Sequence, residues 1–347
     1  MGIMLWQSVV ALKMLPYTEH LSDVRPCLDS AGKAICFAGR TVLICKVMRG
    51  GRAKSMRVYI ERRKNLDKLY GKDYYPMELP IVEAGHIIAY ADVVLTDWYE
   101  GMTLQRIIEE RYTDTEFMQG LLHRFERFAL WLLGQEWAHG DIKPDNIIVD
   151  GDNIHLIDHD AMFLPDMCAE DCEEVGTPAY QHPIRSKENF CRDIDDYPLA
   201  LIITQLAALA YDDMLGKMIS DSDNPFIVPA KAICGADEML DRIEQLFASK
   251  GDARHYHIAK LLRSTHLALP ALPMLIEAAT QTWNGVSPVE IAYKEGYWGY
   301  ISDGEWVVPP LYDMAFDAEN GRGEVKLSNY WFVIDIKTGE ISRLERY

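Results

Sequence analysis

The stretch from His139 to Asp160 holds the residues best suited to chemistry. It reads HGDIKPDNIIVDGDNIHLIDHD and places Asp141, Asn146 and Asp158 among apolar, strand-forming residues. Carboxylate and amide oxygens are hard ligands that Mg²⁺ accepts, and Mg²⁺ usually shares its coordination with phosphate. Lys143 adds a positive charge suited to a phosphoryl group in transfer. These residue types point to metal-assisted phosphoryl chemistry.

The spacing of these residues predicts a β-hairpin that gathers them at one point. Ile147–Val149 and His155–Ile157 are short strand-forming runs, separated by an Asp-Gly-Asp-Asn turn. A hairpin brings the loop before its first strand close to the loop after its second. We therefore expect Asp141 and Asn146 to lie near Asp158. A solvated hairpin would explain any one of these acids, but not the joint pattern.

The order His-x-Asp-x-Lys-x-x-Asn, hairpin and Asp resembles the catalytic loop and metal-binding aspartate of eukaryotic-type Ser/Thr protein kinases. The resemblance implies that Asp141 is the base that orients the substrate hydroxyl, and that Lys143 neutralises charge on the transferred phosphoryl group. It implies that Asn146 and Asp158 bind Mg²⁺ ions that hold the phosphates of ATP. Small-molecule kinases that share His-Gly-Asp usually lack the lysine.

Two departures from the kinase pattern lie in or beside this loop. Gly140 stands where many kinases have an arginine that pairs with a phosphorylated activation segment, so we expect no regulation by that route. His159 and Asp160 replace the Phe-Gly pair after the metal-binding aspartate. Further on, Gly176–Pro183 resembles the end of an activation segment, but its closing Ala-Pro-Glu is only half present.

Helices are expected on both sides of the loop. Apolar residues recur at helical spacing over 115–137, which predicts an amphipathic helix that leads into His139. A second, wholly apolar helix is expected from Asp195 to Ala210. It resembles the central helix of a kinase large lobe, in which Asp195 would anchor the backbone of the catalytic loop. Further helices are predicted at Glu238–Phe247, at Tyr256–Leu262 and from Pro273 to about Thr282.

The N-terminal part of the chain reads mainly as strands. Strand-forming runs cover Ala34–Phe37, Thr41–Met48, Arg52–Ile60, Met77–Val82 and His86–Thr96. This order resembles a kinase small lobe, in which Gly39 is the remnant of the glycine-rich phosphate loop. The resemblance places the hinge at Asp97, Trp98 and Tyr99, whose backbone would hold the adenine of ATP.

Two positions are open for the lysine that pairs with the phosphates of ATP. In one interpretation ICKVM is the lysine-bearing strand, so that Lys46 is the ligand and Glu61 its ion-pair partner. In the other, SMRVY is that strand and Arg57 takes the place of the lysine. Gly50 and Gly51 favour the second, because two glycines between alternating runs indicate a hairpin and are poor helix formers. Arginine is bulkier and forked, so nucleotide geometry would change.

After residue 285 the composition changes to strands and turns. Tyr297, Trp298 and Gly299 begin a unit of strand, turn and strand, and the order recurs in degraded form over Asn329–Glu340. This repeat resembles bacterial WG repeats. So short an array buries little surface by itself, and we expect it to pack on the large lobe. Internal packing is the expected role of its aromatic residues, with a binding surface as the alternative.

Composition limits the partners and the compartment. The chain of 347 residues has a formal net charge of −18, which argues against nucleic acid or an anionic membrane as the main partner. The apolar N-terminus lacks a basic region and is interrupted by Lys13, so we expect neither a signal peptide nor a membrane span. The 7 cysteines follow no disulfide-framework spacing, which favours a reduced, cytoplasmic protein.

Taken together, the resemblance predicts an α+β, bilobal protein-kinase-like fold of bacterial type. Its small lobe would cover 1–100, its α-rich large lobe 101–285 and its WG-repeat-like β tail 286–347. The expected function is ATP- and Mg²⁺-dependent phosphorylation of serine or threonine on a protein substrate. A pseudokinase or scaffold that acts by binding a protein partner is one alternative, motivated by the lone Gly39 and by Arg57. A small-molecule kinase is the other, motivated by His-Gly-Asp.

Overall fold

A computed structural model describes the chain in two units, Met1–Glu100 and Gly101–Tyr347, and we take each unit on its own. The described residues are 26–28, 34–38, 41–48, 75–83, 86–97, 99, 101–172, 174–218, 226–278 and 285–345. Side chains are described at 99 and from 101 onwards within these ranges, except at 160, 217 and 218.

The first unit contains a five-stranded antiparallel sheet in its described part, in the order β1-β2-β3-β5-β4. Its strands are β1 (Pro26–Leu28), β2 (Ala34–Ala38), β3 (Thr41–Met48), β4 (Tyr75–Glu83) and β5 (His86–Asp97). Their β-branched and aromatic residues favour extended backbone. The predicted strands in these ranges are confirmed, and the one predicted at Arg52–Ile60 lies outside the described residues.

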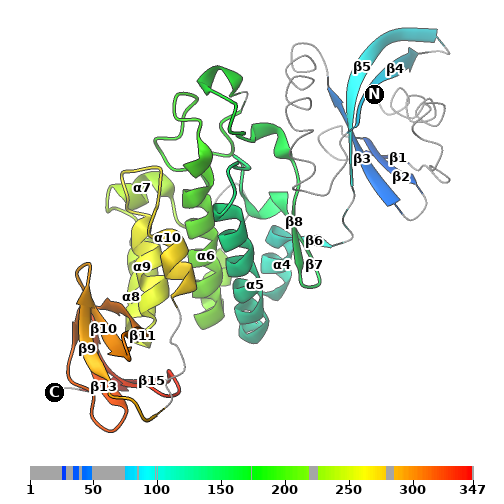
Figure 1. Ribbon diagram of the computed structural model, residues 1–347. Coiled ribbons are helices and arrows are strands. Elements are labelled where there is room, and N and C mark those ends of the chain that lie inside the picture. The colour runs from blue at the N-terminus through cyan, green and yellow to red at the C-terminus, as the bar shows by residue number, and fades with distance from the viewer. Residues whose placement is uncertain are drawn as a thin grey trace. The chain divides into compact units, whose positions relative to one another are not determined.

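Two long helices that pack on each other organise the second unit. They are α5 (Thr115–Leu133) and α6 (Asp196–Tyr211), which lie side by side in Figure 1. Helix α6 is buried along nearly its whole length, as expected for a helix that is apolar on every side. The helix predicted over 115–137 ends earlier, at Leu133, because the chain turns at Gly134 and buries Trp137 beyond the helix end.

Shorter helices complete this unit. They are α4 (Leu104–Arg111), α7 (Pro229–Ile233), α8 (Glu238–Lys250), α9 (Ala253–Leu261) and α10 (Leu272–Glu277). Asp237 and Asp252 begin α8 and α9 because their carboxylates accept backbone N–H groups of the first turn. The last helix ends before the predicted Thr282, since Ala278 is already extended. Within the described ranges no helix is long and apolar enough to span a bilayer.

A small sheet carries the candidate catalytic loop. Its strands, in the order β6-β7-β8, are β6 (Met102–Thr103), β7 (Ile147–Asp150) and β8 (Asn153–Leu156). The predicted hairpin is therefore confirmed, and its turn places Gly151 at a φ of +58°. Gly101 allows β6 to approach β7, because a Cβ at this position would lie 2.1 Å from the backbone oxygen of Val149.

The C-terminal part forms two antiparallel sheets in the described residues, ordered β11-β10-β9 and β12-β13-β14-β15. The strands are β9 (Glu290–Lys294), β10 (Tyr297–Ser302), β11 (Glu305–Tyr312), β12 (Met314–Ala315), β13 (Arg322–Leu327), β14 (Tyr330–Asp335) and β15 (Ile341–Leu344). The predicted order of strand, turn and strand is present. Asp303 and Gly304 join β10 to β11, both with positive φ, as a tight hairpin requires.

These sheets pack on α9 and the loop before it, as the sequence predicted (Figure 1). Nε2 of His257 donates a hydrogen bond to the backbone oxygen of Leu311 at 2.7 Å. The His257 ring also lies 4.4 Å, centroid to centroid, from that of Tyr297. A Cβ at Gly251 would lie 2.6 Å from Cδ1 of Ile341. The loop before α9 therefore lies against the side chains of the tail.

Candidate catalytic site

The hairpin ties the strand before Asp158 to the candidate catalytic loop. The N–H of Ile157 donates to the backbone oxygen of Asn146 at 3.0 Å. The oxygen of Ile157 in turn accepts a hydrogen bond from Nε2 of His139 at 3.0 Å. The residue immediately before Asp158 thus contacts both ends of the 139–146 loop. The predicted hairpin therefore brings the residue before Asp158 to the 139–146 loop.

Asn146 holds Asp141 through its side-chain amide. Nδ2 of Asn146 donates to the backbone oxygen of Asp141 at 2.9 Å and to its Oδ2 at 3.0 Å. Asn146 is 5% exposed, so this amide has a fixed orientation within a packed site. Because both hydrogen bonds use the nitrogen, the amide oxygen Oδ1 is the atom left to coordinate a cation.

The second carboxylate oxygen of Asp141 is held from a distant segment. The N–H of Thr177 donates to Oδ1 of Asp141 at 2.6 Å. Gly176 makes this approach possible, because its φ is +78° and a Cβ there would lie 2.4 Å from the backbone oxygen of Gly140. A carboxylate whose two oxygens are both hydrogen-bonded keeps one orientation, as a catalytic base must.

Asp195 anchors the backbone at the start of the 139–146 loop. Its carboxylate accepts the N–H of Gly140 at 2.8 Å and also the N–H of His139. Burial raises the pKa of Asp195 to about 7, while the two backbone N–H donors act in the opposite direction. The anchoring contact that the sequence predicted for Asp195 is present in the structure.

His139 links the loop to the hairpin as a neutral imidazole. Its Nδ1 accepts the N–H of Asp141 at 3.3 Å, and its Nε2 donates to Ile157. This pair of contacts corresponds to the tautomer with hydrogen on Nε2. The ring of His159 packs against it edge to face, with centroids 5.0 Å apart. His159 therefore packs beside the 139–146 loop.

The backbone explains the glycine at position 140. Gly140 has a φ of +80°, and a Cβ would lie 2.0 Å from the backbone oxygen of Ala161. An arginine at this position requires the backbone of one of the two segments to move. The close contact between the loop and the segment after Asp158 thus requires glycine at position 140.

Asp158 itself has an unusual backbone conformation. Its φ and ψ are both 62°, in the left-handed region that few residues other than glycine adopt. Aspartate tolerates this region better than most residues, and such conformations concentrate at functional sites. Lys143 is extended and precedes the turn η1 (Pro144–Asn146), so it lies between the two residues that contact each other, Asp141 and Asn146.

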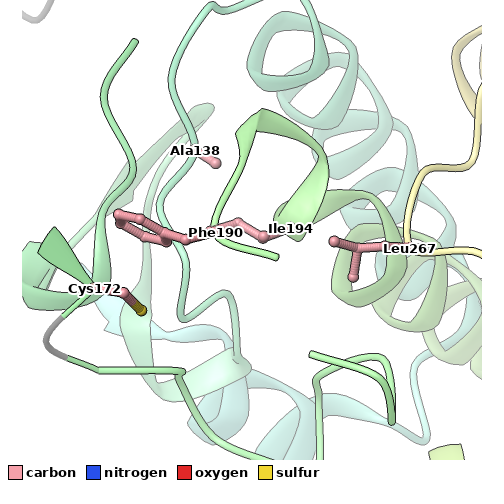
Figure 2. Packing of buried hydrophobic residues seen from close by; sticks show 5 residues of the cluster. All are labelled: Ala138, Cys172, Phe190, Ile194 and Leu267. Carbon is pink, nitrogen blue, oxygen red and sulfur yellow. The ribbon is translucent and has the colours of Figure 1, made fainter. Parts of the chain in front are cut away.

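A hydrophobic cluster fixes the segment that follows Asp158. Phe163 exchanges backbone hydrogen bonds with Ala138, at 2.9 and 3.1 Å, and its ring packs edge to face on Phe190. Phe163, Met167 and Val175 pack on this cluster from the segment. Figure 2 shows its five buried members, Ala138, Cys172, Phe190, Ile194 and Leu267. Apolar contacts therefore hold the segment next to the catalytic loop.

His182 anchors the end of this segment. Nε2 of His182 donates to the backbone oxygen of Ser264 at 3.0 Å, and its Nδ1 accepts the N–H of Ile184 at 3.2 Å. Burial lowers the pKa of His182, which keeps the ring neutral. The sequence placed Thr177, Gln181 and His182 in the stretch that resembles the end of an activation segment, but it did not predict their contacts with the 139–146 loop or with Ser264.

The nucleotide-binding residues predicted in the first unit are described only in part. Lys46 lies on β3 opposite Val94 of β5, and Asp97 ends β5 opposite Leu43. Tyr99 is half-buried. Gly39, Arg57 and Trp98 lie outside the described residues. Lys46 and Arg57 therefore both remain candidates for the phosphate-pairing cation.

The proposed metal-binding residues number only two, which suits Mg²⁺ better than a metal bound entirely by protein side chains. Nowhere in the described ranges do three or more His, Cys, Asp or Glu side chains form a group able to hold a metal. Mg²⁺ needs only one or two protein oxygens when phosphate and water complete its shell. The Oδ1 of Asn146 and the carboxylate of Asp158 are donors of that kind. The four cysteines whose side chains are described are free thiols.

Comparison with known proteins gives structural neighbours only. No family model matches the chain, and no curated protein sequence matches it. In structure the chain is similar to a mutant of the PknI kinase domain from Mycobacterium tuberculosis, with 16% identity, a TM-score of 0.46 and coverage of 74% of this chain and 92% of that one. It is also similar to the LegK7 effector kinase of Legionella pneumophila, with 12% identity, a TM-score of 0.44 and coverage of 78% of this chain and 62% of that one.

Proposed function

We propose that this chain is an ATP- and Mg²⁺-dependent phosphotransferase that phosphorylates serine or threonine on a protein. The observation that carries the proposal is the double restraint of Asp141. Thr177 holds one of its carboxylate oxygens, and Asn146 holds the other. A surface aspartate has no need of such restraint, whereas a base that orients a hydroxyl must keep its position.

The reaction needs little from the protein beyond placement and charge. The oxygen of the substrate hydroxyl attacks the γ-phosphorus of ATP, the bond from that phosphorus to the bridging oxygen breaks, and ADP leaves. Asp141 accepts the hydroxyl proton, which then passes to solvent. Lys143, two positions further on, neutralises charge on the transferred group. Positioning and electrostatic stabilisation of this kind account for most of the catalysis of phosphoryl transfer.

Bound MgATP would supply the phosphoryl group and the metal charge. Asn146 and Asp158 are the residues that would hold the metal. Asn146 suits this role because its nitrogen donates to Asp141, which leaves its oxygen as the atom that could act as a ligand. One amide oxygen and one carboxylate match the modest number of protein ligands that Mg²⁺ takes beside phosphate.

A protein acceptor is favoured over a metabolite for two reasons. Lys143 follows Asp141 by two positions, as in protein kinases. The segment around Thr177 also lies directly on Asp141, in the place where the backbone of a protein substrate would dock in the kinase resemblance. The alternative role, binding without catalysis, is suggested by the lone Gly39 and by Arg57. These residues would weaken nucleotide binding without affecting the catalytic loop.

Phosphate transfer from γ-labelled ATP distinguishes these functions. The intact chain is incubated with Mg²⁺ and either a mixture of unfolded proteins or a mixture of small hydroxylated metabolites. The proposal expects label on serine or threonine of protein, and its loss when the metal is chelated. Label confined to metabolites would support a small-molecule kinase. Binding of MgATP without transfer to either mixture would support a scaffold and contradict the proposal.

A further inference from the structure

Gln181 is a buried amide in the segment that ends the candidate site. Gln181 is 3% exposed, and its Nε2 donates to the backbone oxygen of Gly140 at 3.3 Å. Gly140 directly precedes Asp141 in the chain. Gln181 therefore contacts the very peptide unit that carries the proposed base.

The backbone around Gly140 is held from several directions. Its N–H donates to Oδ1 of Asp195 at 2.8 Å, and the next N–H, that of Asp141, donates to Nδ1 of His139 at 3.3 Å. The oxygen of Gly140 is the remaining polar group, and Gln181 supplies its hydrogen bond. Removal of the Gln181 amide would leave this peptide plane free to rotate on that side.

The turn that carries Gln181 also reaches the carboxylate of the base. The N–H of Thr177, four positions earlier, donates to Oδ1 of Asp141. Gly176 packs between the two contacts, since a Cβ there would lie 2.4 Å from the Gly140 oxygen and 2.8 Å from Nε2 of Gln181. One turn thus contacts both the backbone before Asp141 and its side chain.

Gln181 is also unfavourable for stability in one respect. Its Oε1 is buried and has no hydrogen-bond partner in the described part of the chain. A buried acceptor without a donor destabilises the folded state, and an apolar residue of similar length would avoid that cost. Local features that cost stability are typical of residues retained for function.

We infer that Gln181 is a positioning residue for Asp141; this inference rests on the proposed function. Its amide fixes the carbonyl of Gly140 and keeps the turn seated, so that the N–H of Thr177 stays on Oδ1 of Asp141. The substrate hydroxyl then meets a carboxylate in one orientation. Loss of the amide lowers the rate of the chemical step and leaves nucleotide binding unchanged.

The substitution Gln181→Met tests this role, because it keeps the length of the side chain and removes both polar atoms. We expect kcat to fall by about 10- to 100-fold through misplacement of the base, with the KM for ATP unchanged. The melting temperature should change little, because removal of the unpaired Oε1 offsets the loss of the donor to the Gly140 oxygen. Gln105→Met is a matched control. Gln105 is 5% exposed, its Oε1 is likewise unpaired among the described residues, and its Nε2 donates to Glu109 within α4. Its kcat should stay at the wild-type value.

Amide hydrogen exchange gives a readout that needs no catalysis. Gln181→Met should accelerate exchange of the Thr177 amide and leave the amides of α8 unchanged. Gly176→Ala, which displaces the same turn, should have the same effect on Thr177. Unchanged exchange at Thr177 in Gln181→Met, or a loss of kcat equal to that of Gln105→Met, would overturn the inference. If the wild-type chain transfers no phosphate, the proposed function fails, and exchange at Thr177 still decides the role of Gln181.

Discussion

The carboxylate of Asp195 accepts a hydrogen bond from the backbone N–H of Gly140, 55 positions earlier in the chain, at 2.8 Å. The same carboxylate accepts the N–H of His139, so the start of α6 holds the start of the catalytic loop. Asp195 is 3% exposed. Both of its carboxylate oxygens accept backbone N–H groups. This buried side chain therefore links the core of the second unit to the loop that carries the proposed base.

Asp195→Asn should therefore destabilise the fold and slow phosphate transfer. Asparagine keeps one acceptor but turns an NH₂ group toward the second N–H, which leaves a buried donor unpaired at a cost of about 1–3 kcal/mol. Urea unfolding measures the loss. The control is Asp193→Asn, whose half-exposed side chain makes only a long ion pair with Arg192 at 3.8 Å. Equal unfolding free energies for the two variants would contradict the anchoring role.

Gly140 and Gly151 form a natural pair for testing the contact behind the catalytic loop. Both have positive φ, but a Cβ at Gly140 would meet the oxygen of Ala161 at 2.0 Å, whereas nothing lies within 4 Å of a Cβ at Gly151. Gly151→Ala should cost about 1–2 kcal/mol of unfolding free energy from backbone conformation alone. Gly140→Ala should cost clearly more and also reduce phosphate transfer. Similar losses in the two variants would show that Ala161 does not exclude a side chain at position 140.

A buried charge network gives the fold a defined response to pH. Nδ1 of His255 lies 2.6 Å from Oδ2 of Asp252, and its Nε2 lies 3.0 Å from Oε1 of Glu126. Burial alone would lower the pKa of His255, but its contacts with Asp252 and Glu126 outweigh burial and raise it to about 8. Arg254 faces the same Glu126 at 2.9 Å, and Tyr211 donates to Asp252 at 2.9 Å. His255 is therefore held as an imidazolium.

The sign of the pH effect follows from the raised pKa. A folded-state pKa above the ordinary histidine value of about 6.5 means that His255 stabilises the fold fully below that pH and loses this contribution as pH rises through about 8. The contribution is on the order of 2 kcal/mol. The stability difference between wild type and His255→Gln should shrink by this amount from pH 6.5 to pH 9, as measured by urea unfolding. Parallel pH curves for wild type and His255→Gln would contradict the assignment.

Packing of the C-terminal sheets depends on His257. Its Nε2 donates to the oxygen of Leu311 at 2.7 Å inside a buried contact. His257→Leu should lower the unfolding free energy by about 1–3 kcal/mol, because the Leu311 oxygen loses this buried donor. His266→Leu, at an exposed position in the same unit, controls for removal of an imidazole. If His257→Leu unfolds like wild type, this contact does not hold the tail.

Activity should not depend on phosphorylation of the segment after Asp158. In the kinase resemblance, Gly140 stands where an arginine would pair with a phosphate. Apolar contacts already hold the segment on the cluster in Figure 2. From Asp158 to Arg185 the only hydroxyl side chains are those of Thr177 and Tyr180, and Tyr180 is 2% exposed. Treatment with a phosphatase should leave kcat unchanged. A loss of activity that returns on incubation with ATP would contradict this prediction.

The conformation of the proposed catalytic loop was predictable because its information is local. The spacing of Asp141, Asn146 and Asp158 around a turn-forming Asp-Gly-Asp-Asn sequence specifies a hairpin, and the hairpin places the residues. Asp195 was predictable from the pattern that opens an apolar helix. Strands β2 to β5 of the first unit followed from their β-branched and aromatic residues, whereas β1 was not predicted.

The rest depends on contacts between segments that are distant in sequence. The oxygen of Ala161 excludes a side chain at Gly140, and the turn at Thr177 and Gln181 reaches back to Asp141; neither contact leaves a periodic signal. The end of α5 was misplaced because apolar residues continue to Trp137, which is buried by tertiary packing after the helix has ended. Pattern alone does not separate a buried loop residue from a buried helical one.

The rate of a single turnover tests the central claim most directly. Enzyme in excess over γ-labelled ATP is mixed with Mg²⁺ and a protein acceptor, and transfer is followed for wild type, Asp141→Asn and Asp145→Asn. Asp145 lies in the same loop but makes none of the contacts described above that hold the proposed base. The proposal predicts that Asp141→Asn slows transfer by about 100-fold or more, while Asp145→Asn transfers at the wild-type rate. Transfer by Asp141→Asn at the wild-type rate would contradict it.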